Sequence, residues 1–242
     1  MTKSNCIITC GIDMAEYARL FTYEALSEST CAVTGYVGSE PVSLLIPETS
    51  PDGRTVVAIG DRAFSNRTAL RAVTLPDSVE SIGVRSFAFC TGLLDVRTSS
   101  ESRLTAIGAR AFMGCERLTV LRFGRLRHLA SLGRNTFAYC TRLRSVVLPE
   151  GLCDLAPSLF EGCSALEHVH LPKTLTAIRT AAFSACKSLR MLTLPPSLQV
   201  IEDCAFAWCG HLTDLRLPES VCVISGSAFM ECVALTDILK AG

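Results

Sequence analysis

The sequence lacks any excess of charge, because its 23 lysines and arginines balance its 23 aspartates and glutamates. Proteins that bind nucleic acid gather Lys and Arg on one surface, so no nucleic-acid partner is predicted. Long apolar runs are also missing, and no stretch approaches the ~20 residues that span a bilayer. A short apolar patch runs from Ile7 to Thr9, but a secretory leader needs roughly 7–15 apolar residues. We therefore expect a cytoplasmic protein, or a cell-surface or secreted one if a leader is missing or export is non-classical.

Motifs of catalysis and metal binding are absent as well. The sequence contains no phosphate-binding glycine loop, no Gly-x-Ser-x-Gly elbow and no His-Glu-x-x-His pair. It also lacks the Cys-x2-Cys spacing of zinc sites. We therefore predict a protein that is not an enzyme and needs no cofactor or metal.

What the sequence does contain is a repeat of 23 to 25 residues, marked by phenylalanine. A fixed period of this length predicts a solenoid, in which each unit buries its apolar side against its neighbours. The pattern falls in the leucine-rich-repeat range. The repeat phenylalanines are Phe64, Phe87, Phe112, Phe137, Phe160, Phe183, Phe206 and Phe229.

One unit, residues 183–206, shows how a coil should be built. Residues 192–194 alternate apolar and polar, which predicts a strand with one buried face. Pro195 cannot donate to a ladder and ends that strand. Leu198 and Ile201 should enter the core on a second side, and the segment from Phe206 onward should form a short helical or 3-10 turn on the convex side. The fold class predicted is an α/β solenoid with a core column of phenylalanines.

Two repeats are longer than the others by two residues. Ser99 and Gly124 stand where other units have proline after the strand. We expect the additional residues to bulge at one edge without disturbing the buried set.

Cysteine is abundant, with 13 residues, but its placement argues against disulfides. Seven cysteines lie three residues after a repeat phenylalanine. Equivalent side chains on stacked strands are ~4.8 Å apart and parallel, whereas a disulfide needs Cβ atoms ~3.8 Å apart and turned together. We predict a ladder of small, buried, free thiols. These cysteines are Cys90, Cys115, Cys140, Cys163, Cys186, Cys209 and Cys232.

The N-terminal part carries no repeat. Residues 21–25 and 31–35 alternate apolar and polar around a polar turn, which predicts a β-hairpin that caps the open end of the solenoid. We divide the chain into residues 1–40, an extension with the capping hairpin, and residues 41–242, a leucine-rich-repeat domain of about eight units.

The residues that alternate out of the core should form two columns on the concave face. Several of them are apolar where no core requires it, which favours an interaction surface. The candidate binding residues are Val120, Arg122, Ser145, Val147, His168, His170, Met191, Thr193, Asp214 and Arg216.

Several functions are open for such a surface. The first is a protein–protein interaction module that uses the concave face, for example to attach to host or bacterial proteins. The second is a binder of a small apolar ligand in the same groove. A purely structural or oligomerising role is the third, since the uncovered edge of the last predicted strand predicts self-association. His168 and His170 point to one side, but no third ligand completes a zinc site.

Two further groups of residues have mainly structural interpretations. Phe89, Tyr139 and Trp208 share one slot of the repeat and are predicted to fill gaps between turns rather than to bind. A local basic cluster is predicted to be a solvated edge, with an acidic partner as the minority alternative. This cluster comprises Arg117, Arg122, Arg125, Arg127, His128 and Arg134.

The repeat consensus is Leu-Pro-x-x-Leu-x-x-Ile-x-x-x-Ala-Phe-x-x-Cys-x-x-Leu, as in residues 194–212. It resembles the BspA-like leucine-rich repeat family of bacteria, and the resemblance covers roughly residues 21–242. It implies a right-handed superhelix with a concave face lined by strands. It also implies a role in binding host or bacterial proteins, as many relatives are similar to surface proteins.

Overall fold

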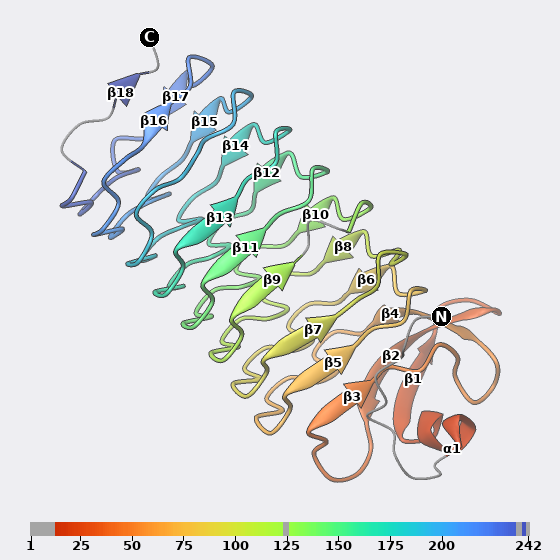
Figure 1. The fold of residues 1–242 in the computed structure, drawn as a ribbon. Coiled ribbons are helices and arrows are strands. Elements are labelled where there is room, and N and C mark those ends of the chain that lie inside the picture. The colour runs from red at the N-terminus through yellow and green to blue at the C-terminus, as the bar shows by residue number, and fades with distance from the viewer. Residues whose placement is uncertain (1–12, 123–125, 236–238, 241–242) are drawn as a thin grey trace.

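Most repeats contribute two short strands that stack in parallel on those of a neighbouring repeat, giving a β-solenoid of about eight turns (Figure 1). The computed structural model describes residues 13–122, 126–235 and 239–240. The strands of one side are β3 (Ser43–Leu45), β5 (Ala72–Thr74), β7 (Asp95–Arg97), β9 (Val120–Arg122), β11 (Ser145–Val147), β13 (His168–His170), β16 (Arg216–Leu217) and β18 (Leu239–Lys240). Those of the other side are β4 (Thr55–Ile59), β6 (Ser81–Ile82), β8 (Ala106–Ile107), β10 (Ser131–Leu132), β12 (Asp154–Leu155), β14 (Ala177–Ile178), β15 (Val200–Ile201) and β17 (Val223–Ile224).

We use the name long-strand face for the outward side of the first set of strands. It comprises β3, β5, β7, β9, β11 and β13, residues 191–193, and β16. Its strands do not form one continuous ladder. β3, β5 and β7 make one sheet and β9, β11 and β13 another, and no strand pairing joins β7 to β9 in the described ranges. The interruption lies at the first of the two longer repeats, whose additional residues follow β7. An insertion alone does not open the sheet, because the second longer repeat carries its additional residues after β9 and β9 still pairs with β11.

The phenylalanine column is buried, as predicted. Seven of its rings, from Phe64 to Phe206, are at most 1% exposed. Successive rings from Phe64 to Phe229 stack with centroids 5.3 to 5.8 Å apart and with planes within 16° of parallel. Offset stacking of this kind adds to the hydrophobic stabilisation of each coil.

The turns that carry these rings are not helical. Apart from α1 (Met14–Ala18), the described residues contain no helix, so the expected helical or 3-10 turns on the convex side were wrong and the solenoid is almost entirely β. Two causes are visible in the turn after β6. Arg85 and Phe89 have φ values of 55° and 60°, which interrupt a right-handed helix. The amide of Phe87 donates to the carbonyl of Ala111 in the next coil rather than within its own turn.

We call Phe89, Tyr139 and Trp208 the turn-side aromatics. Two of them cover a glycine of the next coil. A Cβ on Gly114 would lie 2.7 Å from Cδ1 of Phe89, and one on Gly162 would lie 2.6 Å from Cδ1 of Tyr139. Both rings, like Trp208, remain partly exposed. Gap filling therefore holds for Phe89 and Tyr139, but these two residues and Trp208 are 43%, 46% and 49% exposed, so all three are also exposed aromatics.

The seven repeat cysteines are free and buried. Each thiol donates a hydrogen bond to the carbonyl of the phenylalanine in the preceding coil, with S···O distances of 3.0 to 3.3 Å. Burial raises the pKa of Cys140 to about 12 and raises the pKa values of Cys163 and Cys186 well above the usual thiol value. These groups are protonated, and therefore unreactive, at neutral pH.

This burial predicts a clear pattern of thiol labelling at pH 8. Cys153 and Cys222 are exposed and should react with iodoacetamide in the native protein, which makes them internal controls. Cys140, Cys163 and Cys186 should remain unlabelled until the protein is denatured. Timed mass spectrometry of peptides would measure both groups. Native labelling of the buried three at the rate of the exposed two would contradict the described packing.

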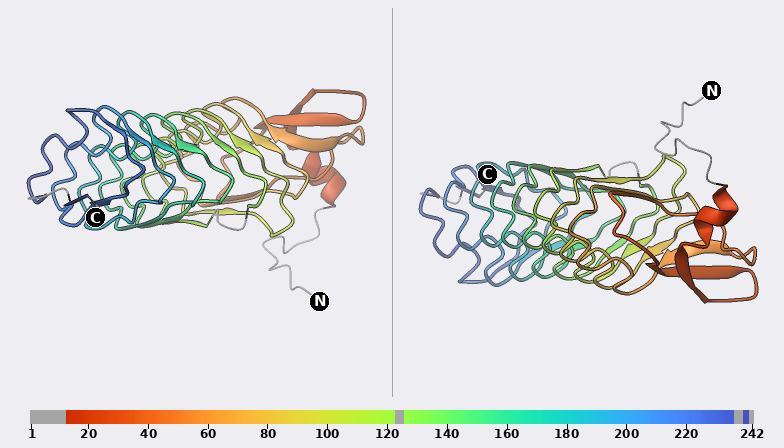
Figure 2. Two further views of the ribbon diagram at one scale, coloured as in Figure 1. Left: turned by 90° about the horizontal axis from the view of Figure 1, so that it is seen from above. Right: turned by 90° about the horizontal axis from the view of Figure 1, so that it is seen from below.

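An antiparallel hairpin of β1 (Phe21–Ala25) and β2 (Thr30–Tyr36) lies at the N-terminal end of the stack (Figure 2). β2 also pairs in parallel with β4, so the hairpin continues the second ladder. Phe21 is buried and packs edge-on against Phe64, with centroids 6.4 Å apart. Its stabilising role as a cap and the domain division at residue 40 stay predictions. None of the helices described is long and apolar enough to cross a membrane.

Candidate functional site

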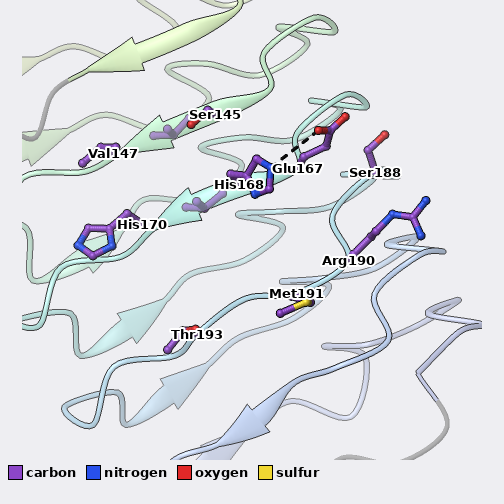
Figure 3. A pocket seen from close by; sticks show the side chains of 11 residues that line it. Ser145, Val147, Glu167, His168, His170, Ser188, Arg190, Met191 and Thr193 are labelled. Carbon is purple, nitrogen blue, oxygen red and sulfur yellow. Dashed lines mark ion pairs between the residues drawn. The ribbon is translucent and has the colours of Figure 1, made fainter.

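A groove of about 510 Å³ opens on the long-strand face beside β11, β13 and residues 188–193 (Figure 3). Six of the ten predicted binding residues line it, namely Ser145, Val147, His168, His170, Met191 and Thr193. The strands place them there because alternate residues of β11 and β13 point away from the core, and the two strands are in register, with Ser145 opposite His168 and Val147 opposite His170.

The groove exists because the ladder stops after β13. Residues 191–193 form no strand pairing with β13 in the described structure, and Met191 makes a single bridge to Asp214 on the far side. The missing strand leaves the inward residue of β13 less covered than that of β11. Val146 in β11 is 1% exposed, whereas Val169 in β13 is only partly buried. A hollow has formed where the next strand would otherwise have continued the sheet.

Apolar and polar groups alternate along this groove. Val147 is 39% exposed and Met191 is 65% exposed, so both present apolar surface to solvent. His168 and His170 project from the same side of β13, and Nε2 of His168 lies 4.0 Å from Oε2 of Glu167 (Figure 3). Arg190, from the next coil, also lines the groove. Methionine, arginine and imidazole groups around exposed aliphatic carbon suit a surface that another molecule covers.

Of the four remaining predicted residues, two lie in a hollow next to the groove and two do not. Asp214 and Arg216 line a hollow of about 240 Å³ together with Met191 and Thr193, so it adjoins the groove. Val120 lies apart, in a hollow of about 660 Å³ between β7 and β9. Arg122 ends β9, and its side chain lies outside the described residues. The structure therefore brings eight of the ten residues together.

Five residues that line the groove were not among the predicted ones: Val146 and Val169, which belong to the inward row, and Glu167, Ser188 and Arg190. Glu167 and Arg190 directly precede the outward columns at His168 and Met191. Both residues line the groove at the end where the outward columns begin. Their position next to the predicted outward columns could have identified them as groove residues. Alternation alone does not do so, because it assigns the residue before an outward one to the core side.

The histidine pair does not have the surroundings of a zinc site. Structural and catalytic zinc ions take three or four protein ligands. No group of three His, Cys, Asp or Glu side chains close enough to hold a metal ion is found in the ranges that the structure describes. The imidazoles are therefore available as hydrogen-bonding groups on an open surface.

Stacked parallel strands, a repeat of 23 to 25 residues and a continuous leucine and phenylalanine core define a leucine-rich-repeat solenoid of the bacterial type. The profile of the BspA type leucine rich repeat region matches residues 57–190 and 105–236, with six copies. The chain belongs to this family.

Solved structures show the same fold. The T. pallidum leucine-rich repeat protein is 30% identical, with a TM-score of 0.73 over 81% of this chain and 90% of that one. Leucine-rich repeat proteins from Bacteroides ovatus and Eubacterium ventriosum are 23% and 21% identical, each with a TM-score of 0.61. They align with 96% and 86% of this chain, and with 71% and 49% of their own lengths. A comparison with functionally curated proteins finds no match.

Proposed function

We propose that this protein is a non-enzymatic interaction module that binds a protein partner through its long-strand face. The main support for this proposal is the groove, which combines exposed apolar surface with polar groups that can fix the orientation of a partner. Its central residues are Val147, His168, His170 and Met191. Membership of a leucine-rich-repeat family supports an interaction role. Attachment to host or bacterial proteins is one use of such a surface, and the compartment in which it acts stays a prediction.

A protein suits this groove better than the alternative, a small apolar ligand. Pockets for small molecules bury roughly 70–90% of the ligand within mostly apolar walls. Here the Met191 residue is 65% exposed and the His168 side chain is 79% exposed, so the walls are themselves open to solvent. A broad partner surface can cover such a groove, whereas a small ligand would remain largely in water.

The experiment is photo-crosslinking from within the groove. A photoreactive amino acid at position 191 should capture a partner protein from the natural surroundings of the chain. The same amino acid at position 80 is the control, because Glu80 is exposed beside β6 on the other side of the solenoid. Equal capture from both positions would contradict a site on the long-strand face. Organic extraction and mass spectrometry of the purified protein would reveal a small apolar ligand instead.

Self-association through the C-terminal end is a second proposal. Val223 and Ile224 of β17 are 52% and 39% exposed, whereas Ile201, the counterpart of Ile224 in β15, is fully buried. An apolar strand edge of this kind can pair with another copy. Sedimentation velocity at rising concentration should show dimers, and only monomers at high concentration would reject the proposal.

A further inference from the structure

A second surface lies where the turns lead into the strands of the long-strand face, at the level of β5 to β11. It is a hollow of about 700 Å³ that shares no residue with the groove described above. Its walls are polar and bear three arginines from three different repeats. The lining residues are Thr68, Arg71, Thr91, Gly92, Glu116, Arg117, Thr141 and Arg142.

The three guanidinium groups form a row along the solenoid. Arg117 and Arg142 stand two residues after the repeat cysteine in neighbouring coils, and Gly92 holds the same place in the coil before them. A Cβ on Gly92 would collide with Nη1 of Arg71, so the guanidinium of Arg71 occupies the place that a side chain would take there. Three successive coils, which are stacked ~4.8 Å apart, thus each carry one guanidinium at this edge.

The first guanidinium of the row is held in position by the backbone. Nη1 of Arg71 donates to the carbonyl of Thr68 at 3.1 Å, and the residue is only partly exposed. Arg117 and Arg142 are exposed. Gly92 has no side chain, and this leaves room for the guanidinium of Arg71. The row of three guanidinium groups therefore depends on a glycine at position 92.

The row is not neutralised by the protein itself. No ion pair to Arg71, Arg117 or Arg142 occurs among the described residues. Glu116 is the one acidic residue in the lining. Like charges this close repel one another, and an anionic ligand would relieve that repulsion. Guanidinium groups donate paired hydrogen bonds to sulfate, phosphate and carboxylate oxygens, and the threonine hydroxyls beside them add further donors.

We propose that this arginine row, formed by Arg71, Arg117 and Arg142, binds a sulfated polysaccharide. Such a chain presents sulfates, carboxylates and hydroxyls at regular intervals, which matches a regular row of guanidinium and hydroxyl groups. No aromatic side chain lines the hollow, so nucleobases would find nothing to stack on. An acidic peptide would find no pocket for its own apolar side chains.

The test is calorimetric titration with a heparin oligosaccharide at ~0.05 M salt and again at ~0.15 M, where charge screening is stronger. Wild-type protein should bind, and more weakly at the higher salt. The double variant Arg117→Gln/Arg142→Gln should bind at least ~10-fold more weakly, since each lost contact is a charge-assisted hydrogen bond. The matched control is Arg103→Gln/Arg134→Gln, which removes the same charge from exposed sites beside β8 and β10 and should bind as wild type does.

Three outcomes would overturn the proposal. They are absence of heparin binding to the folded wild type, unchanged affinity in Arg117→Gln/Arg142→Gln, and equal affinity for desulfated heparin. Polyglutamate and single-stranded DNA serve as competing probes, and binding of either one as tightly as heparin would assign the row to a different class of partner. Val147→Asp/Met191→Asp should keep full heparin affinity, so this proposal and the proposed function can fail separately.

Discussion

Replacing Phe183 with alanine should lower the free energy of unfolding by about 3–5 kcal/mol, the usual cost of truncating a buried phenylalanine. Phe183 has no exposed surface and stacks on both sides, with centroid distances of 5.6 Å to Phe160 and 5.4 Å to Phe206. Domains have a total stability of only ~5–15 kcal/mol, so the loss is a large fraction of it. Urea denaturation followed by circular dichroism would measure the change.

Two control variants make the result specific. Lys187→Ala alters an exposed residue of the same coil and should change stability by no more than ~0.5 kcal/mol. Phe229→Ala should fall between the two, because Phe229 is only partly buried and its described ring contact is with Phe206, at 5.3 Å. If Phe183→Ala proved no more destabilising than Lys187→Ala, the stacked column would not be the core of the fold.

The buried column could be predicted because period and burial are linked in a solenoid. Each coil has the same neighbours above and below, so a side chain that is buried in one repeat is buried in the others. Phe183 and Cys186 repeat for this reason, and so does Leu198 on the second side of the core. Apart from β4, the strands on that side contain only two residues. Alternation cannot be recognised over two residues, so the sequence indicated their burial but not the ladder.

The turns could not be predicted, because bonds between coils determine their shape. Phe89 and Arg85 adopt positive φ although neither is a residue type that favours it. A hydrogen bond to the next coil offsets the cost of the positive φ. The amide of Phe89 donates to the carbonyl of Met113 at 2.7 Å. A sequence of the form Ala-Phe-x-x-Cys is compatible with a helical turn when it is considered alone.

The candidate site was likewise predictable only in part. Alternation within β11 and β13 identifies Val147, His168 and His170 as outward residues. It does not show that pairing stops between β13 and Met191, which is what hollows the face into a groove. The arginine row is less visible still, since Arg71 fills the slot of Gly92 from the preceding repeat.

The double variant Val147→Asp/Met191→Asp should abolish binding of the partner captured by crosslinking, while the protein stays folded. A partner that covers the groove would desolvate both residues, and a buried carboxylate without a counter-charge is costly. Residues at the centre of an interface commonly contribute 2 kcal/mol or more, so the dissociation constant should rise at least ~30-fold. Surface plasmon resonance with immobilised partner would measure it.

Stability should change little, because Val147 and Met191 are 39% and 65% exposed. Aspartate is unfavourable in a strand, at a cost of up to ~1 kcal/mol for the change in β11. The matched control, Val84→Asp/Met230→Asp, places two aspartates at a valine and a methionine that are 40% and 41% exposed and lie outside the long-strand face. It carries the same added charge and should bind the partner as wild type does. Retained binding by a folded Val147→Asp/Met191→Asp protein would move the site elsewhere, to the turn-side aromatics or the N-terminal hairpin.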